Sequence, residues 1–211
     1  TIKLFDDCSY YNEIATTAQQ LPRMMQAAIQ TAISKKGVSV IGLPGDLTSQ
    51  KVANIDSSNT PYHTQPVVSP QIIKKIASLL NKANKITIFC GIGAQNAHDE
   101  VVELSQSLNA PVAYSFKGKM GIQHNNPNEV GMTGLLGLPS GYYSMQEAEI
   151  LLLLGTDFPY TPFMPENSYI IQVDIRANRI GKRAKVNMGV VGDVKDTLKI
   201  LNPLIEPKKD D

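Results

Sequence analysis

The chain has 211 residues, of which 42 % are hydrophobic and 18 % charged, and 20 Lys and Arg against 19 Asp and Glu give a formal net charge of +1. This composition is typical of a globular protein, and the balanced charge argues against the clustered basic surface that nucleic acid binding would need. No apolar run reaches the roughly 18 residues of a membrane-spanning helix, and the first residues lack the basic and apolar regions of a secretory signal.

A helix followed by a buried strand is predicted for the first part of the chain. Between residues 21 and 36, apolar side chains recur at the three- and four-residue spacing of one helix face: Met25, Ala28, Ile29, Ala32 and Ile33. Gly37 ends this helix, and the apolar run 38–43 that follows is typical of a strand. One helix and one strand cannot form a core alone. Because the chain also lacks an initiating Met, we expect residues 1–47 to be the end of a larger domain.

A second domain is predicted to begin near residue 69. Residues 48–68 are rich in Ser, Asn, Thr, Pro and Gln and are interpreted as a linker. Ser69 and Pro70 then suit the cap and first turn of a helix, whose apolar face is Ile72, Ile73, Ile76, Leu79 and Leu80. We expect this domain to cover residues 69–203, with 204–211 as a tail or the start of the next linker.

Within the second domain, apolar runs of strand length alternate with helices. Strands are expected at 85–90, 111–114, 149–154, 169–175 and 186–191, and helices at 98–108 and, capped by Asp193, through Leu201. Continuous rather than alternating apolar strands indicate a parallel sheet covered on both faces. The predicted fold class is therefore α/β, a doubly wound, Rossmann-like parallel sheet preceded by part of a second α/β domain. Residues 115–140 are interpreted as a long loop, which is uncommon unless it serves a site.

The cysteine and histidine residues give no sign of a metal site. Cys8 and Cys90 cannot form a disulfide framework or a cysteine-rich zinc site, and both are expected to be small buried side chains. His63, His98 and His124 are far apart in the sequence, lack metal-ligand spacing, and are interpreted as surface or loop residues. Free thiols favour a reducing, cytoplasmic setting.

Unusual residues follow successive predicted strands, at the edge where open parallel sheets bind ligands. They are residues 91–94, 131–137, 155–160 and Asp174. Glycines let backbone N–H groups approach a diphosphate, and an acidic residue at a strand end can bind ribose hydroxyls. Each cluster also has a structural explanation: the glycines as tight turns, the aromatic residues as loop packing, and Asp174 as a turn cap. Their shared position favours an extended dinucleotide as ligand.

Five stretches carry a resemblance to a known family: residues 38–46, 130–137, 153–160, 171–175 and 191–193. At these residues the chain resembles the thiamine-diphosphate enzymes that also carry FAD, in particular the pyruvate oxidases and the quinone-dependent pyruvate dehydrogenases. The second and third stretches, VGMTGLLG and LLGTDFPY, are specific to the pyruvate-oxidising branch. The resemblance covers essentially the whole chain.

The resemblance implies a three-domain subunit, of which this chain holds about one and a half domains. Residues 1–47 resemble the end of the domain that binds the thiamine aminopyrimidine, and 69–203 resemble the central FAD-binding domain. The family's pattern implies FAD contacts at Gly91, Gly93, Thr133, Gly134, Leu135, Leu136, Thr156, Asp157, Phe158, Pro159, Tyr160 and Asp174, the last on the adenosine ribose. Gly91 and Gly93 match the pattern less closely than the others.

The family's catalytic parts are expected to lie outside this chain. The activating glutamate belongs to an absent part of the first domain. The Gly-Asp-Gly motif that binds the diphosphate with Mg²⁺ is also missing, because Gly45-Asp46 and Gly192-Asp193 lack the glycine at its third position. This chain alone is therefore expected to be inactive, with no catalytic residue and no metal site of its own.

For the intact enzyme, the resemblance implies oxidation of pyruvate to acetate and CO₂ with thiamine diphosphate, Mg²⁺ and FAD, and a quinone as electron acceptor. It also implies a cytoplasmic homotetramer, in which any peripheral membrane contact would come from an absent C-terminal region.

Two other interpretations stay open, and a third lacks its usual zinc site. An acetolactate synthase-like carboligase has the same fold with structural FAD, and the 156–160 stretch favours the oxidising branch over it. A sirtuin-like deacylase would need zinc-binding cysteine pairs, which two separated cysteines cannot give. A nucleotide-binding module without catalysis would share the fold and keep a vestigial site.

Overall fold

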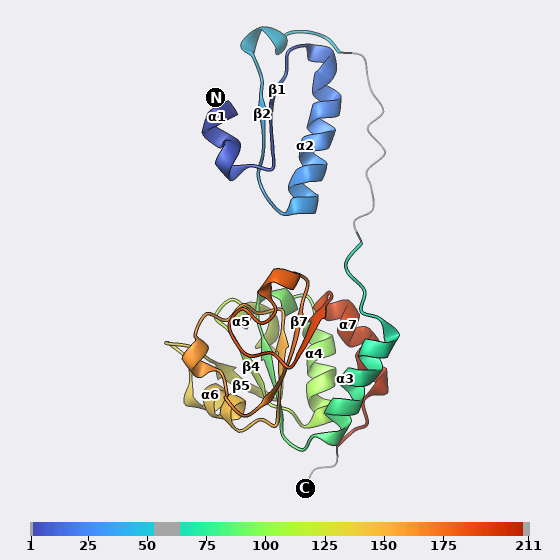
Figure 1. Ribbon diagram of the computed structural model, residues 1–211, viewed down its shortest axis with the longest axis vertical. Coiled ribbons are helices and arrows are strands. Elements are labelled where there is room, and N and C mark those ends of the chain that lie inside the picture. Colours follow the sequence, from blue (N-terminus) through green and yellow to red (C-terminus); the bar gives the residue numbers. More distant parts are fainter. Residues whose placement is uncertain (1, 53–63, 209–211) are drawn as a thin grey trace. The chain divides into compact units, whose positions relative to one another are not determined.

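Two units make up the chain, Thr1–Thr64 and Gln65–Asp211. The computed structural model describes residues 2–52 and 64–208 (Figure 1). Residues 53–63 of the predicted linker at 48–68 lie outside these ranges. None of the helices in the described part of the chain combines the length and the apolar character that crossing a bilayer requires.

The first unit is a two-stranded parallel sheet with one long helix. β1 (Tyr11–Ile14) pairs with β2 (Ser39–Gly42), and α2 (Leu21–Lys35) connects them. The remaining elements are short: α1 (Ile2–Phe5), η1 (Asp6–Cys8), η2 (Ala18–Gln20) and η3 (Gly45–Leu47). The predicted helix is confirmed, and the predicted strand is β2, which is only partly buried. The residue that turns the chain at the end of α2 is Lys36, with φ of +49°, and not Gly37.

The apolar face predicted for α2 is largely exposed. Met25, Ile29 and Ile33 each leave close to half of their surface accessible, whereas Ala28 of the same face is buried, together with Met24 beside it. The core of this unit is correspondingly small, formed by Ala15, Met24 and Leu47. The two strands of this unit are too few to cover the whole apolar face of α2, so Met25, Ile29 and Ile33 stay accessible in the described residues.

The second unit is a six-stranded parallel sheet in the order β5-β4-β3-β6-β7-β8. The strands are β3 (Ile86–Cys90), β4 (Val112–Tyr114), β5 (Glu129–Met132), β6 (Ile150–Leu154), β7 (Tyr169–Asp174) and β8 (Met188–Val191). The α-helices are α3 (Pro70–Lys82), α4 (His98–Leu108), α5 (Lys119–Ile122), α6 (Pro139–Gln146) and α7 (Val194–Leu201). Four short 3-10 turns complete it: η4 (Ile92–Ala94), η5 (Thr161–Phe163), η6 (Ala177–Arg179) and η7 (Asn202–Leu204). The doubly wound parallel α/β class is confirmed.

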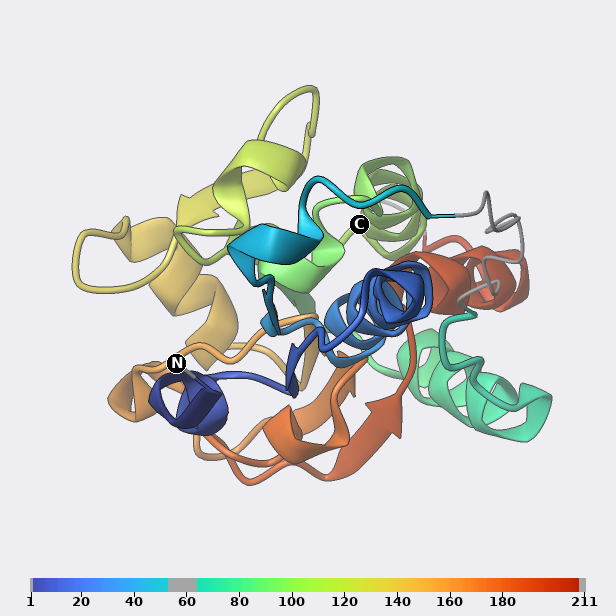
Figure 2. The same ribbon diagram turned by 90° about the horizontal axis from the view of Figure 1, so that it is seen from above.

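Helices cover both faces of this sheet. α3, α4 and α7 lie on one face and α6 on the other, as both views show (Figures 1 and 2). Leu152 of β6 belongs to the core on the first face, with Leu104 and Leu198. Its neighbour Leu151 belongs to the core on the second face, with Met145. Because successive strand residues point to opposite faces, burial on both sides explains the uninterrupted apolar run of β6.

The 115–140 segment is more ordered than its sequence predicts. It contains α5, β5 and the start of α6, and β5 forms one edge of the sheet. A glutamate and a glycine interrupt the apolar pattern of β5, so periodicity gives no strand signal. Glu129 accepts hydrogen bonds from the Tyr114 hydroxyl at 3.0 Å and from the Gly131 N–H at 2.7 Å. Burial, together with the Glu129 carboxylate, raises the pKa of Tyr114 to about 12.

The two cysteines differ in accessibility. Cys90 is buried at the end of β3, as predicted, whereas Cys8 is exposed, so the prediction for Cys8 is wrong. Burial raises the pKa of the Cys90 thiol far above its ordinary value, and the thiolate is the reactive form. We therefore expect a maleimide to modify Cys8 in the folded chain and Cys90 only after unfolding. Mass spectrometry of the wild type and of Cys8→Ser measures this, and rapid labelling of folded Cys8→Ser would contradict it.

Candidate functional site

The direction of strand addition reverses in the middle of the sheet, between β3 and β6. From β3 the chain moves outward through β4 to β5, and then returns to the other side of β3 to form β6. In open parallel sheets, ligands bind outside the carboxyl ends of the strands at such a switch point. The predicted clusters follow β3, β5, β6 and β7, so the topology brings all four to this edge.

Gly91 and Gly93 meet the backbone of the loop after β6. The N–H of Gly91 donates to the Leu154 carbonyl and that of Gly93 to the Gly155 carbonyl, both at 2.9 Å. A Cβ at Gly91 would lie 2.6 Å from the Cα of Thr156, and a Cβ at Gly93 would lie 2.7 Å from the Cα of Gly155. Both N–H groups therefore already have hydrogen-bond partners within the fold. The two loops approach so closely that neither position has room for a side chain.

The turn after β5 presents two leucine side chains to solvent. Leu135 is 72 % exposed and Leu136 is 85 % exposed. Thr133 points inward instead, because its buried hydroxyl faces α6, where a Cβ at Gly141 would lie 2.5 Å from the oxygen. Within the described residues this hydroxyl has no hydrogen-bond partner. The turn therefore offers a ligand apolar side chains and backbone groups.

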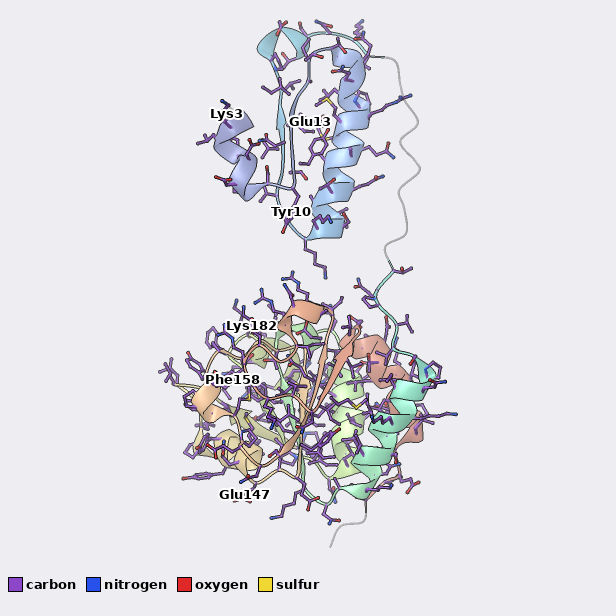
Figure 3. The ribbon with its side chains drawn as sticks, in the orientation of Figure 1. Lys3, Tyr10, Glu13, Glu147, Phe158 and Lys182 are labelled. Carbon is purple, nitrogen blue, oxygen red and sulfur yellow. The ribbon has the colours of Figure 1, made fainter. Side chains whose placement is uncertain are left out.

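The loop after β6 packs against that turn through two aromatic rings. A Cβ at Gly134, whose φ is +140°, would lie 3.3 Å from the ring of Tyr160 and 3.6 Å from that of Phe158. Phe158, labelled in Figure 3, is buried. Its ring centroid is 4.9 Å from that of Phe89. Pro159, between Phe158 and Tyr160 in the sequence, is exposed. The β5 turn and the β6 loop are therefore in contact with each other.

The two predicted acidic residues follow neighbouring strands but have different surroundings. The Asp157 carboxylate pairs with Arg179 and Arg183. Asp174, at the end of β7, is only 7 % exposed, and it accepts a hydrogen bond from the Arg176 N–H at 2.8 Å. Burial raises the pKa of Asp174 above its ordinary value, and the Arg176 bond opposes this rise. A buried carboxyl with a perturbed pKa at a ligand-binding edge is a candidate functional group.

Replacement of Asp174 by Asn is expected to stabilise the fold at neutral pH. A raised pKa means that the folded protein ionises this carboxyl less readily than the unfolded chain does. This cost is absent below the unfolded pKa of about 3.9 and grows as the pH rises through the folded value. We therefore expect a higher Tm than that of the wild type at neutral pH, and no gain in acid.

Thermal melts at neutral and acid pH measure this effect. Glu147→Gln removes an exposed carboxyl elsewhere in the same unit (Figure 3) and is the matched control. A Tm of Asp174→Asn below that of the wild type at neutral pH would contradict the prediction.

Sequence reasoning missed a basic segment that follows β7. Five of the ten residues from 176 to 185 are basic: Arg176, Arg179, Lys182, Arg183 and Lys185. The near-zero net charge of the whole chain conceals this cluster, which a charge count over short windows would have found. Two of its members, Arg179 and Arg183, reach back to Asp157 on the neighbouring loop.

His98 and His124 are adjacent in space, although they are distant in the sequence. Their rings stack with centroids 4.0 Å apart and planes 8° from parallel. They line a surface cavity of about 370 Å³ together with Asp99 and Glu103. Among the described residues, no group of three or more His, Cys, Asp or Glu side chains could hold a metal ion. His63 lies outside the described residues.

The strand order and the loops gathered at its switch point define a doubly wound α/β domain of the Rossmann order. The family model for the thiamine pyrophosphate enzyme, central domain, matches residues 73–201. The chain belongs to this family of thiamine pyrophosphate enzymes.

Comparison with curated proteins finds relatives of several kinds. An uncharacterised 42.6 kDa protein from the isoamylase 3′ region of Pseudomonas amyloderamosa is 39 % identical, over 98 % of this chain and 53 % of its own length. The pyruvate oxidase of Lactiplantibacillus plantarum is 28 % identical, over 92 % of this chain and 34 % of its own. The large subunit of acetolactate synthase isozyme 1 of Escherichia coli is also 28 % identical, over 93 % and 36 %.

A solved structure supports the fold. The benzoylformate decarboxylase of Polynucleobacter necessarius matches with a TM-score of 0.76 and 22 % identity, over 94 % of this chain and 39 % of that one. The chain therefore spans about half the length of the first relative and between a third and two fifths of the others.

Proposed function

We propose that this chain is the FAD-binding central part of a thiamine-diphosphate-dependent pyruvate oxidase, preceded by the end of its pyrimidine-binding domain. The intact enzyme would convert pyruvate to acetate and CO₂ and pass the electrons through FAD to a quinone. One observation carries the proposal. The 133–136 turn and the 156–160 loop, which resemble the flavin-binding stretches of pyruvate oxidases, contact each other through Gly134 and Tyr160 beside two exposed leucines.

The described residues fit a flavin dinucleotide along this edge. Leu135, Leu136 and Tyr160 provide apolar surface for a flat ring system. The Asp174 carboxylate at the end of β7 provides an acceptor for ribose hydroxyls. Gly91 and Gly93 act indirectly, because they let the β6 loop approach the switch point. Bound FAD would supply the transfer of two electrons, and these residues would hold it, orient it and exclude water.

The proposal assigns the remaining parts of the reaction to the intact enzyme. Thiamine diphosphate with Mg²⁺, and pyruvate, would bind mainly to regions beyond the described residues. A homotetramer in the cytoplasm, reduction of a membrane quinone and a peripheral membrane contact through a further C-terminal region rest on the resemblance to quinone-dependent pyruvate dehydrogenases.

Binding of FAD by the purified 211-residue chain tests the flavin site. The chain contains no Trp, so flavin fluorescence can be titrated without indole emission. We expect a saturable change with FAD, competition by ADP, and much weaker binding of riboflavin, which lacks the adenosine end. No saturable change would contradict the proposal. ADP binding without a preference for FAD would instead favour a nucleotide-binding module.

A carboligase of the acetolactate synthase type is the second candidate, because its relative is as similar as the pyruvate oxidase at 28 % identity. Incubation of the intact enzyme with pyruvate separates the two activities. Reduction of a quinone or dye without acetolactate supports the pyruvate oxidase. Acetolactate formation without reduction of the acceptor would overturn it.

A further inference from the structure

Two ion pairs tie the loop after β6 to the segment after β7. Oδ2 of Asp157 pairs with Nη1 of Arg179, and Oδ1 lies 3.2 Å from Nε of Arg183. Both oxygens of one carboxylate are thus occupied by two guanidinium groups. The three side chains are between 24 % and 38 % exposed, so solvent screens these pairs less than pairs on the open surface.

A buried amide joins the same two segments. The Gln172 side chain in β7 donates from Nε2 to the Thr156 carbonyl at 3.1 Å and to the Arg179 carbonyl at 3.3 Å. Its Oε1 accepts from the Gly181 N–H at 2.9 Å. A buried polar group whose donors and acceptor are all used favours one arrangement of its partners. Gln172 therefore fixes the backbone on both sides of the ion pairs.

Asp157 is the acidic partner of two segments whose other charged residues are all basic. It is the one acidic residue in the segments 155–164 and 176–185, which together hold five basic residues. Without it, Arg183 would lose its carboxylate partner, and Arg179 would keep only the more distant interaction with Asp174. The next residues of its loop are Phe158, which is buried, and Tyr160, which contacts the β5 turn at Gly134. The position of this contact therefore depends on where Asp157 is held.

We propose that Arg179, Arg183 and Gln172 form a clamp on Asp157 and Thr156 that holds the 156–160 loop in place. Arg179 and Arg183 are then positioning residues of the site. Asp157 acts through these pairs and not through contact of its side chain with a ligand. The consequence for ligand affinity rests on the proposed FAD function, whereas the consequence for the loop itself does not.

Hydrogen exchange of the complete chain tests the clamp without any ligand. The amides of Phe163 and Met164 follow the 156–160 loop and donate to the carbonyls of Tyr160 and Thr161. In Asp157→Asn, we expect these two amides to exchange at least tenfold faster relative to the amides of β6. Arg179→Gln should give a similar change and Arg179→Lys, which keeps the charge, a smaller one. Lys185→Gln removes an exposed cation of the same segment and is the control. Equal acceleration in the loop and in β6 would overturn the inference.

The salt dependence of hydrogen exchange distinguishes the ion pairs from an uncharged packing contact. Raising the ionic strength to about 1 M shortens the Debye length to about 3 Å. It should speed exchange of the loop amides in the wild type and have little further effect in Asp157→Asn. The same salt response in both proteins would overturn the clamp.

Flavin titration provides the second arm of the test. Asp157→Asn and Arg179→Gln should each raise the Kd for FAD about three- to tenfold, with the Lys185→Gln control unchanged. If the wild type binds FAD and the variants bind it equally well, the positioning role is wrong. If the wild type binds no FAD, the proposed function fails, and the exchange experiment alone decides the clamp.

Discussion

Gly155→Ala is expected to destabilise the second unit by about 2–4 kcal/mol, because one methyl group meets two obstacles at once. The φ of Gly155 is +57°, a conformation that disfavours any residue with a Cβ. The added Cβ would also lie 2.5 Å from the Cα of Gly93 and 2.9 Å from the nitrogen of Ala94. These are backbone atoms of the other switch-point loop, which cannot move aside as a flexible side chain would.

Two further alanine variants separate the two causes. Gly181 has a φ of +72° and nothing within 4 Å of its added Cβ, so Gly181→Ala carries only the conformational cost of about 1 kcal/mol. Gly91 has an ordinary φ of −101°, but its Cβ would overlap the Gly155 carbonyl oxygen, so Gly91→Ala carries only the packing cost of about 1–3 kcal/mol.

Urea unfolding of the three variants and the wild type measures these free energies. The expected order of destabilisation is Gly155→Ala first, Gly91→Ala second and Gly181→Ala last. If Gly155→Ala costs no more than Gly181→Ala, the two loops separate easily. The switch point would then be a loose contact and not the fixed base of the site that the structure indicates.

The elements that the sequence predicts well are those whose signal is local. The five apolar residues of β6 and the periodicity of α4 are burial patterns that any parallel sheet with covering helices requires. Asp193 caps α7 by accepting from the Asp196 N–H at 3.0 Å, an interaction within four residues of chain. β5 was missed for the opposite reason, since it is a strand chiefly because β4 offers it a partner.

For the candidate site too, the sequence predicts some features and not others. The sequence places the four clusters at one edge, because the carboxyl ends of parallel strands meet there. It does not say where each side chain points. Asp157 finds its partners 22 and 26 residues away, because β6 and β7 are neighbours in the sheet. Thr133 turns inward toward Gly141 for a similar reason, since α6 packs below its turn. These orientations depend on strand order and on packing, and the spacing of apolar residues in the sequence reveals neither.

Replacing both Leu135 and Leu136 by Ser is expected to weaken FAD binding at least tenfold and to leave the stability of the fold unchanged. Both side chains are largely exposed, at 72 % and 85 %, so the folded chain gains little from them. A ligand that covers part of each leucine gains a fraction of the roughly 1.5–3 kcal/mol of full burial. About 1.4 kcal/mol already corresponds to a tenfold change in Kd.

Leu204→Ser is the control, because Leu204 is also exposed, at 40 %, and its carbonyl accepts a hydrogen bond from Asn81 near the end of α3 that leads into the amino end of β3. Thermal melts and flavin titrations of the wild type, the double variant and the control measure both quantities. A lower Tm in the double variant would mean that the leucines already stabilise the fold. An unchanged Kd with an unchanged Tm would remove the 133–136 turn from the flavin site, and the exposed leucines would then need another partner in the intact enzyme.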